Sequence, residues 1–185
     1  MIKVLFVCHG NICRSVAAEF IFKALIKERH LESLFQVASR ATSNEEIGNN
    51  IYPPMQKALL RQGIAFQAHY AKQITQKDYD EYDYIFLMDS YNLKTIRYVI
   101  QNDEKQKIKL LSNFISASKE VEDPWYTGLF DEVVLQLKDY CTKCLEQILK
   151  ENEEREIYEK AFIIFRDVFF PMCGLSVYTY IDIRN

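Results

Sequence analysis

Two residues near the start of the chain, Cys8 and Arg14, have the types and the spacing needed for chemistry on a phosphate group. An arginine presents a planar fork of donors that suits phosphate oxygens. Cysteine thiols beside a helix N-terminus and a cation titrate at roughly 3.5–7.5, below their ordinary value of about 8.5. The pattern therefore predicts a thiolate nucleophile at the floor of an anion site. The alternative is a buried strand-end cysteine before an ordinary surface loop, because free cysteine is often a small core residue.

The segments around these two residues favour a phosphate cradle. An apolar run over residues 4–7 predicts a buried strand, and a helical pattern begins at Ser15. Unpaired N–H groups and the dipole at a helix N-terminus attract anions. Between the two elements, Gly10 lets the backbone curl closely and Asn11 tolerates left-handed backbone angles. We expect Ser15 to cap the helix and to offer its hydroxyl to the Cys8 sulfur.

The loop resembles the phosphate loop of the low-molecular-weight protein tyrosine phosphatases, and the similarity extends over residues 1–150. The resemblance implies that Cys8 is the nucleophile and Arg14 the anion-binding arginine. Two positions differ from the commonest family pattern: His9 stands where Leu or Thr is usual, and Val16 where Pro is common. His9 is expected either at the rim of the site or in solvent. The phosphate-binding residues that the resemblance implies are His9, Gly10, Asn11, Ile12, Cys13, Arg14 and Ser15.

A second segment, Asp123–Tyr126 (Asp-Pro-Trp-Tyr), could supply a general acid. A carboxyl group on a loop over the anion site can protonate the leaving oxygen of a phosphate ester. Asp-Pro alone is a common turn pair, but together with the Cys8 loop the segment resembles the acid loop of the family. Asp123 is therefore the expected acid. We expect Trp125 and Tyr126 to line the substrate cleft and grip an aromatic ring, with Tyr52 and the loop at 49–50 on the opposite lip.

The resemblance also implies supporting residues elsewhere in the chain. His69 and Asp89 correspond by position to a histidine and an aspartate that brace the phosphate loop in the family. Ser15, Ser39 and Ser43 correspond to members of its hydrogen-bond network. Cys13 shares the loop with Cys8, so we also expect redox sensitivity, through a disulfide between a Cys8 sulfenic acid and Cys13.

Apolar runs alternate with helical patterns along residues 1–150. This alternation predicts an α/β fold, a single doubly wound domain with a four-stranded parallel sheet and helices on both faces, of flavodoxin-like topology. Ligands in such folds lie beyond the carboxyl ends of the strands, which is where the Cys8 loop leaves the first strand. We expect strands at 2–7, 35–39, 84–88 and 107–111, short extended structure at 68–71, and helices at 15–28, 53–61, 90–100 and 129–150.

Composition narrows the class of protein. The net charge of −3 does not indicate the basic surface of a nucleic-acid-binding protein. Five cysteines in a chain of 185 residues do not indicate a disulfide framework. The segment before Cys8 is too short for a signal peptide, so a cytoplasmic location is expected. Cys141 and Cys144 have C-x2-C spacing, but they lie on the apolar stripe of a helix without a second pair nearby, so we interpret them as core residues. No metal and no cofactor is expected.

The C-terminal extension, residues 151–185, differs from the rest of the chain. A charged stretch is followed by an apolar one at 161–181 that is long enough to cross a membrane. Arg166, Asp167 and Pro171 lie within it and argue against a membrane span. The extension could instead pack on the domain, join two subunits or lack order, and the sequence gives no oligomeric state.

The function predicted from these residues is hydrolysis of phosphotyrosine in proteins or peptides, and of small aryl phosphates, with inorganic phosphate as product. Arsenate reductase is a rival of the same fold, but it needs further redox cysteines, and residues 66–110 contain none. Protein arginine phosphatases are a second rival, and their loop resembles this one except for Thr at the position of Ile12. The rival from another class is a phosphotyrosine- or anion-binding module without activity, against which the intact Cys8, Arg14 and Asp123 argue.

Overall fold

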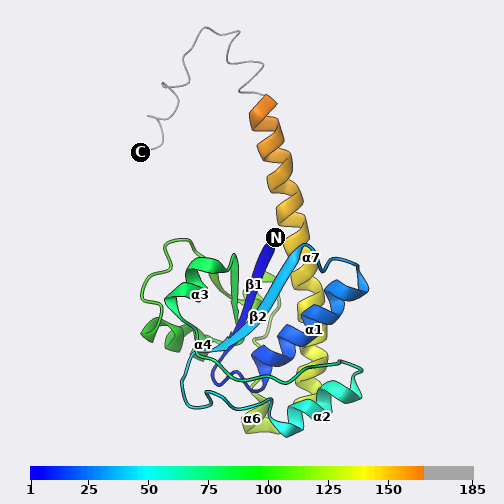
Figure 1. Ribbon diagram of the computed structural model, residues 1–185, viewed down its shortest axis with the longest axis vertical. Coiled ribbons are helices and arrows are strands. Elements are labelled where there is room, and N and C mark those ends of the chain that lie inside the picture. The colour runs from blue at the N-terminus through cyan, green and yellow to red at the C-terminus, as the bar shows by residue number, and fades with distance from the viewer. Residues whose placement is uncertain (165–185) are drawn as a thin grey trace. The chain divides into compact units, whose positions relative to one another are not determined.

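The computed structural model describes residues 1–164 as an α/β protein (Figure 1). The strands are β1 (Ile2–Cys8), β2 (Phe35–Ala41), β3 (Tyr84–Leu87) and β4 (Ile108–Leu110). The helices are α1 (Arg14–Glu28), α2 (Pro53–Arg61), α3 (Gln76–Glu81), α4 (Ser90–Thr95), the 3₁₀ helix η1 (Ile96–Tyr98), α5 (Leu111–Phe114), α6 (Pro124–Thr127) and α7 (Phe130–Ile164).

The four strands form one parallel sheet in the order β2-β1-β3-β4. The predicted fold class is therefore confirmed. The chain passes from β1 to β2 on one side and later returns to β3 on the other side of β1. Strand order thus reverses beside β1, and ligands of open α/β sheets bind at such a switch point. The loop that starts at Cys8 leaves β1 at this place.

Alternate residues of the central strands face two different helical layers, because successive side chains of a strand point to opposite faces. Leu5, Val7 and Leu87 belong to a buried cluster that includes residues of α3 and η1. On the other face, the ring of Phe6 lies 5.6 Å from that of Phe22 in α1. Figure 1 shows α3 and α4 on one side of the sheet and α1 on the other. Burial on both faces explains why β1 is apolar without a break from Val4 to Cys8.

Local sequence signals set several helix ends. Pro53 starts α2, and Gly63 follows its end at a φ of +71°, as a residue beyond a helix C-terminus often does. Thr75 and Asp78 form a reciprocal capping box at the start of α3. At α4, Asp89 is the N-cap, because its carboxylate accepts the backbone N–H of Asn92 at 2.6 Å.

Other expected boundaries also differ from the structure. Ser15 is not the cap of α1: the helix begins at Arg14, Cys13 is the N-cap without a side-chain hydrogen bond, and the Ser15 hydroxyl contacts the Cys8 sulfur instead. The segment 68–71 forms no strand; a single bridge between Ala41 and Gln73 lies just beyond it. The strand expected at 107–111 ends at Leu110, and α5 follows it directly. The helix expected to reach residue 100 ends earlier and is followed by η1.

The long helix α7 contributes its first half to the compact unit formed by residues 1–145. Cys141 is fully buried there, and its thiol faces the carbonyl oxygen of Ala18 in α1 at 3.8 Å. Burial also raises the pKa of Cys141. Cys141 and Cys144 are both buried, in agreement with their interpretation as core residues.

The expected C-terminal extension begins inside α7, which continues without a break to Ile164. Across residues 1–164, no helix is both long enough and apolar enough to span a membrane. Most of the apolar stretch predicted at 161–181, including Arg166, Asp167 and Pro171, lies outside the described residues. The division into a domain at 1–150 and an extension at 151–185 stays a prediction.

Candidate active site

The loop between β1 and α1 turns its carbonyl groups outward, toward the elements that surround it. The carbonyl oxygens of Cys8 and His9 accept backbone N–H groups from the chain after β2, at 2.8 and 3.0 Å. Those of Asn11 and Ile12 accept from the His69 ring and the backbone of Tyr52, both at 2.9 Å. In a trans peptide the C=O and the next N–H point in opposite directions. The N–H groups at positions 9, 10, 12 and 13 therefore face the inside of the loop, where an anion would lie.

Asn11 is the residue that holds the loop in shape. It adopts the left-handed conformation, with a φ of +59°, and is completely buried. Its Oδ1 accepts the backbone N–H of Lys72 at 3.1 Å and the Nε2–H of His69 at 3.2 Å. Its Nδ2 donates to the hydroxyls of Ser39 at 2.8 Å and Ser15 at 3.0 Å. All four hydrogen-bonding positions of the amide are thus occupied.

The orientation of this amide decides where the Ser15 proton points. The backbone N–H of Lys72 can only donate, so the atom that it meets is the Asn11 oxygen, and the Asn11 nitrogen must donate to Ser15. The single proton of Ser15 is then free for the Cys8 sulfur, which lies 3.0 Å away. An O–H donor directed at the sulfur is the hydrogen bond that a thiolate accepts.

Two histidines flank the loop in different environments. His69 is partly buried, and burial lowers its pKa, an effect that the bond to the Asn11 carbonyl opposes in part. Since a carbonyl only accepts, the Nε2 atom of His69 carries a proton. His9 lies at the mouth of the site, where its Nε2 is 3.0 Å from Oε2 of Glu45 and its ring centroid is 5.9 Å from that of Tyr91. Of the two places expected for His9, the rim is the one observed.

Arg14 lies under the loop with its guanidinium between two aspartates. Its Nη1 donates to Asp89 and, at 3.2 Å, to the carbonyl of Val121. Its Nη2 donates to Oδ2 of Asp123 at 2.5 Å. Burial by itself lowers the pKa of Arg14, but the negative charges of Cys8, Asp123 and Asp89 outweigh it and raise the pKa above its ordinary value. Arg14 is therefore a permanent cation at the floor of the site.

Asp123 occupies the start of α6, directly above Arg14. Its Oδ1 accepts the backbone N–H of Trp125 at 3.1 Å, which caps the helix and fixes the carboxylate. The segment that precedes α6 is held at the end of β3, because the N–H of Val121 donates to the carbonyl of Met88 at 3.0 Å. The indole of Trp125 packs 5.0 Å from the ring of Tyr52, centroid to centroid. Tyr52 thus packs against Trp125 without lining the cavity itself.

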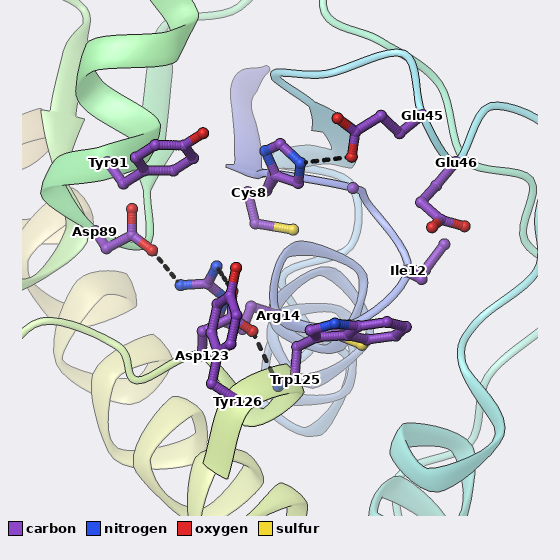
Figure 2. Close-up of a pocket in the computed structure, with 13 residues that line it drawn as sticks. Cys8, Ile12, Arg14, Glu45, Glu46, Asp89, Tyr91, Asp123, Trp125 and Tyr126 are labelled. Atoms are coloured by element: carbon purple, nitrogen blue, oxygen red, sulfur yellow. Dashed lines mark hydrogen bonds and ion pairs between the residues drawn. The ribbon is translucent and has the colours of Figure 1, made fainter. Parts of the chain in front are cut away.

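A cavity of about 430 Å³ opens over these residues. Figure 2 shows Cys8 and Arg14 at its centre and Asp123, Trp125 and Tyr126 along one side. The residues that line it are Cys8, His9, Gly10, Ile12, Cys13, Arg14, Glu45, Glu46, Asp89, Tyr91, Asp123, Trp125 and Tyr126.

The lining differs from the expected one in three respects. Tyr52 and the loop at 49–50 are not part of it; the opposite wall comes from Glu45 and Glu46 in the same connection. Tyr91 of α4 also lines the cavity and was not anticipated. The only sequence signal for these residues was their proximity to Ser43 and Asp89, which the family resemblance had marked.

The remaining predicted supporting residues divide into two groups. Ser39 is buried and extends the hydrogen-bond network of Asn11, since its hydroxyl donates to Oε2 of Glu19 at 2.6 Å. Glu19 was missed, although a charged residue within the otherwise apolar stretch 16–22 was a usable signal. Ser43 touches the phosphate loop through its backbone N–H, and its hydroxyl only accepts the N–H of Glu45 at 3.4 Å.

Gly10 has a packing role. A Cβ atom at this position would lie 3.0 Å from Cγ of Glu46. The absence of a side chain is therefore what allows Glu46 to approach the loop. A cluster of three or more histidine, cysteine or carboxylate side chains arranged for a metal ion is absent from residues 1–164. In this part of the chain, the buried cation of the site is Arg14.

The structure thus combines an α/β fold with a cysteine at the end of β1 and an arginine at the start of α1. Comparison with known proteins finds the same class of protein. The sequence model of the family described as low molecular weight phosphotyrosine protein phosphatase matches residues 3–154. The chain belongs to this family. The human low molecular weight phosphotyrosine protein phosphatase is 38% identical over 152 residues, which cover 80% of this chain and 94% of that protein.

Two further relatives have solved structures. Low molecular weight protein-tyrosine-phosphatase YfkJ of Bacillus subtilis is 39% identical over 155 residues, or 83% of this chain and 99% of its own. Its crystal structure matches with a TM-score of 0.77 over 82% of this chain and 96% of that one. DARP, a Drosophila arginine phosphatase, is 31% identical with a TM-score of 0.71 over 80% of this chain and 98% of its own. The predicted family, fold and enzyme class are confirmed.

Proposed function

We propose that the protein hydrolyses phosphotyrosine in proteins or peptides, and small aryl phosphates, through a cysteinyl-phosphate intermediate. One observation carries the proposal: the Cys8 sulfur, the Arg14 guanidinium and the Asp123 carboxylate line the same cavity, with inward-facing amides around it. This arrangement offers a nucleophile, a charge clamp and a proton donor to one phosphate ester. The family membership supports the substrate class.

In the first step, the Cys8 thiolate attacks phosphorus and the bond to the tyrosyl oxygen breaks. The amides of the loop and Arg14 bind the equatorial oxygens, on which negative charge is held throughout. Asp123 protonates the departing tyrosyl oxygen. Asp123 contacts the Arg14 guanidinium in the free protein, so we propose that the phosphate dianion takes over this contact and leaves the Asp123 carboxyl group available to the tyrosyl oxygen.

In the second step, water attacks the phosphocysteine while Asp123, now ionised, accepts a proton from it. The thiolate of Cys8 leaves, and inorganic phosphate is released. The Ser15 hydroxyl, 3.0 Å from the sulfur, can donate to the thiolate as it forms. Asp89 holds Arg14 in place and itself caps α4, so it acts as a positioning residue.

The cavity wall favours an aromatic substrate. Ile12 presents a branched apolar side chain to the cavity, and Trp125 and Tyr126 present aromatic surface. A phenyl ring gains from apolar burial and aromatic contact at such a wall. Among the alternatives, the arginine phosphatase is the nearest, given the Drosophila relative. Ile12 offers no hydroxyl to a guanidinium, so we propose phosphotyrosine as the preferred substrate.

Two further expectations belong to this proposal. We propose that residues 1–150 carry the activity, which the family match over 3–154 supports. A nucleophile that must stay a free thiol fits a reducing cytoplasm.

Turnover of p-nitrophenyl phosphate, with and without a metal chelator, tests the proposed function. We expect release of inorganic phosphate that the chelator does not change, because the groups assigned to catalysis are side chains and amides. Absence of turnover in a folded protein that still binds phosphate would favour the anion-binding module instead.

A further inference from the structure

Two adjacent carboxylates, those of Glu45 and Glu46, form one side of the mouth of the catalytic cavity. Figure 2 shows both on the connection after β2, across from Asp123 and Tyr126 and with Cys8 between the two sides. A phosphotyrosine side chain that reaches Cys8 has to pass this mouth. The residues next to the phosphotyrosine in a protein substrate therefore lie close to Glu45 and Glu46.

Both carboxylates are held against the phosphate loop by its own residues. Oε2 of Glu45 lies 3.0 Å from Nε2 of His9. The side chain of Glu46 packs over Gly10, where a Cβ atom would come within 3.0 Å of its Cγ. The backbone bond from Ser43 to the His9 carbonyl, 3.0 Å long, ties the same segment to the loop. The two acidic groups thus lie beside the phosphate loop at the mouth.

Glu45 and Glu46 differ from the other carboxylates of the cavity in that neither is paired with Arg14. Asp89 and Asp123 both pair with Arg14, which neutralises part of their charge. The observed partner of Glu45 is the His9 ring, and that of Glu46 is the neutral amide of Asn49, at 2.6 Å. The Glu45 side chain is 68% exposed. The mouth therefore presents negative charge to an approaching peptide.

Exposed aromatic side chains line other parts of the same mouth. Tyr91, whose ring lies 5.9 Å from that of His9, is 59% exposed, and Tyr126 on the other side is 85% exposed. Both side chains line the cavity. Exposed aromatic faces attract the cationic groups of arginine and lysine, and so reinforce the preference that the carboxylates create.

We propose that Glu45 and Glu46 are specificity-determining residues that select phosphotyrosines flanked by arginine or lysine. The inference rests on the proposed function, since it names the protein substrates of the same cavity. The phosphate of the substrate is bound by the loop and Arg14, whereas the flanking residues meet the carboxylates. Peptides with acidic flanks are disfavoured by like-charge repulsion at the same place.

The test uses three phosphotyrosine peptides that differ only in flanking residues: lysine, glutamine or glutamate. For each, kcat/KM is measured, and the affinity is measured for a matched peptide that carries a non-hydrolysable phosphonate. The wild-type protein is compared with the double variant Glu45→Gln/Glu46→Gln, which keeps side-chain size. Glu32→Gln, an exposed residue just before β2 and so at the opposite end of the sheet, is the matched control.

We expect the lysine-flanked peptide to exceed the glutamate-flanked one by roughly ten-fold, since two exposed ion pairs contribute modestly. The ratio should fall toward one in the double variant and in about 1 M salt, where the screening length is about 3 Å. Glu32→Gln should keep the wild-type ratio. Equal affinities of the three phosphonate peptides, or a ratio that the double variant keeps, would overturn the inference. If the protein binds the phosphotyrosine peptides but hydrolyses none of them, the proposed function is overturned. The ratio of affinities for the lysine-flanked and glutamate-flanked phosphonate peptides would then decide the role of Glu45 and Glu46 by itself.

Discussion

The guanidinium of Arg14 joins the two carboxylates that frame the cavity, and its Nη2 atom lies 2.5 Å from Oδ2 of Asp123. The phosphate-binding cation and the expected proton donor are therefore in direct contact. Asp89 holds the other end of the guanidinium, so Arg14 can exchange Asp123 for a phosphate oxygen without leaving its place. The proton-donor role of Asp123 then depends on substrate binding.

Asp123→Asn is expected to slow the hydrolysis of phenyl phosphates with poor leaving groups by roughly 10²–10⁴, the usual contribution of a positioned proton donor. The loss should shrink as the pKa of the leaving phenol falls, since such phenolates leave without a proton. A series of substituted phenyl phosphates measures this dependence. Asp131→Asn serves as the control, because Asp131 is half-exposed, pairs with Arg61 and lies outside the cavity lining. A loss that is the same for every leaving group would assign Asp123 another role.

Sequence reasoning reached the centre of the site because its residues fall in two short segments of the chain. The loop from Cys8 to Ser15 and the Asp123 segment each carry a dense local pattern, and alternating strands and helices place both at the same edge of a sheet. The apolar runs of β1 and β3 are strong signals because both faces of the sheet are covered.

The rest of the site depends on contacts between distant residues. Nothing local distinguishes Glu45 and Glu46 from solvated glutamates, and their approach to the loop depends on Gly10 and His9. Tyr91 lines the cavity, but no local pattern marks it, and its place there depends on the packing of α4 beside the loop that starts at Cys8. The cap assigned to Ser15 was wrong, because the helix begins one residue earlier, at Arg14. The Ser15 hydroxyl contacts Cys8, as expected, and also accepts a hydrogen bond from Asn11, which was not expected.

The burial of His69 gives the protein a pH-dependent stability. Its pKa is lowered from 6.5 in the folded state, so the unfolded chain binds more protons between that lowered value and about pH 6.5. The unfolding free energy should therefore fall as the pH decreases through this window, whereas above about pH 7 His69 is neutral in both states and adds no slope.

Denaturant unfolding at a series of pH values checks this expectation. His69→Gln should flatten the decline between pH 7 and 5, since glutamine does not titrate. His30→Asn is the control: His30 is exposed and has a φ of +56°, which asparagine readily adopts. An unchanged slope in His69→Gln would remove His69 as its source.

Reversible oxidation is expected at Cys8 and Cys13. Burial raises the pKa of Cys13, and the negative charges of Cys8 and Asp123 raise it further, so Cys13 is a protonated thiol at neutral pH. Peroxide should convert the Cys8 thiolate to a sulfenic acid, which condenses with the Cys13 thiol to a disulfide and releases water. A dithiol should then restore activity.

The activity recovered with a dithiol after peroxide treatment shows which thiol traps the Cys8 sulfenic acid. Cys13→Ser should recover more poorly than the wild type, because its sulfenic acid is left open to irreversible oxidation. Cys144→Ser, a change at a buried cysteine of α7 outside the cavity lining, should recover like the wild type. Equal recovery in the two variants would remove Cys13 from this role.

Ile12 is expected to set the preference between phosphotyrosine and phosphoarginine. The side chain is 8% exposed and lines the cavity. Matched peptides should give a higher kcat/KM for phosphotyrosine than for phosphoarginine, phosphoserine or phosphothreonine. Ile12→Thr should move the ratio toward phosphoarginine, because the added hydroxyl can bond a guanidinium. A wild-type preference for phosphoarginine would contradict the substrate assignment.

Trapping of the covalent intermediate tests the account most directly. The wild-type protein is mixed with ³²P-labelled phosphotyrosine peptide, quenched in acid during turnover and digested, and the labelled fragment is identified. We predict label on the fragment that contains Cys8 in the wild type, and neither label nor turnover in Cys8→Ser, which should still bind vanadate. Label on another residue, or near-native turnover by Cys8→Ser, would contradict the proposal that Cys8 is the nucleophile.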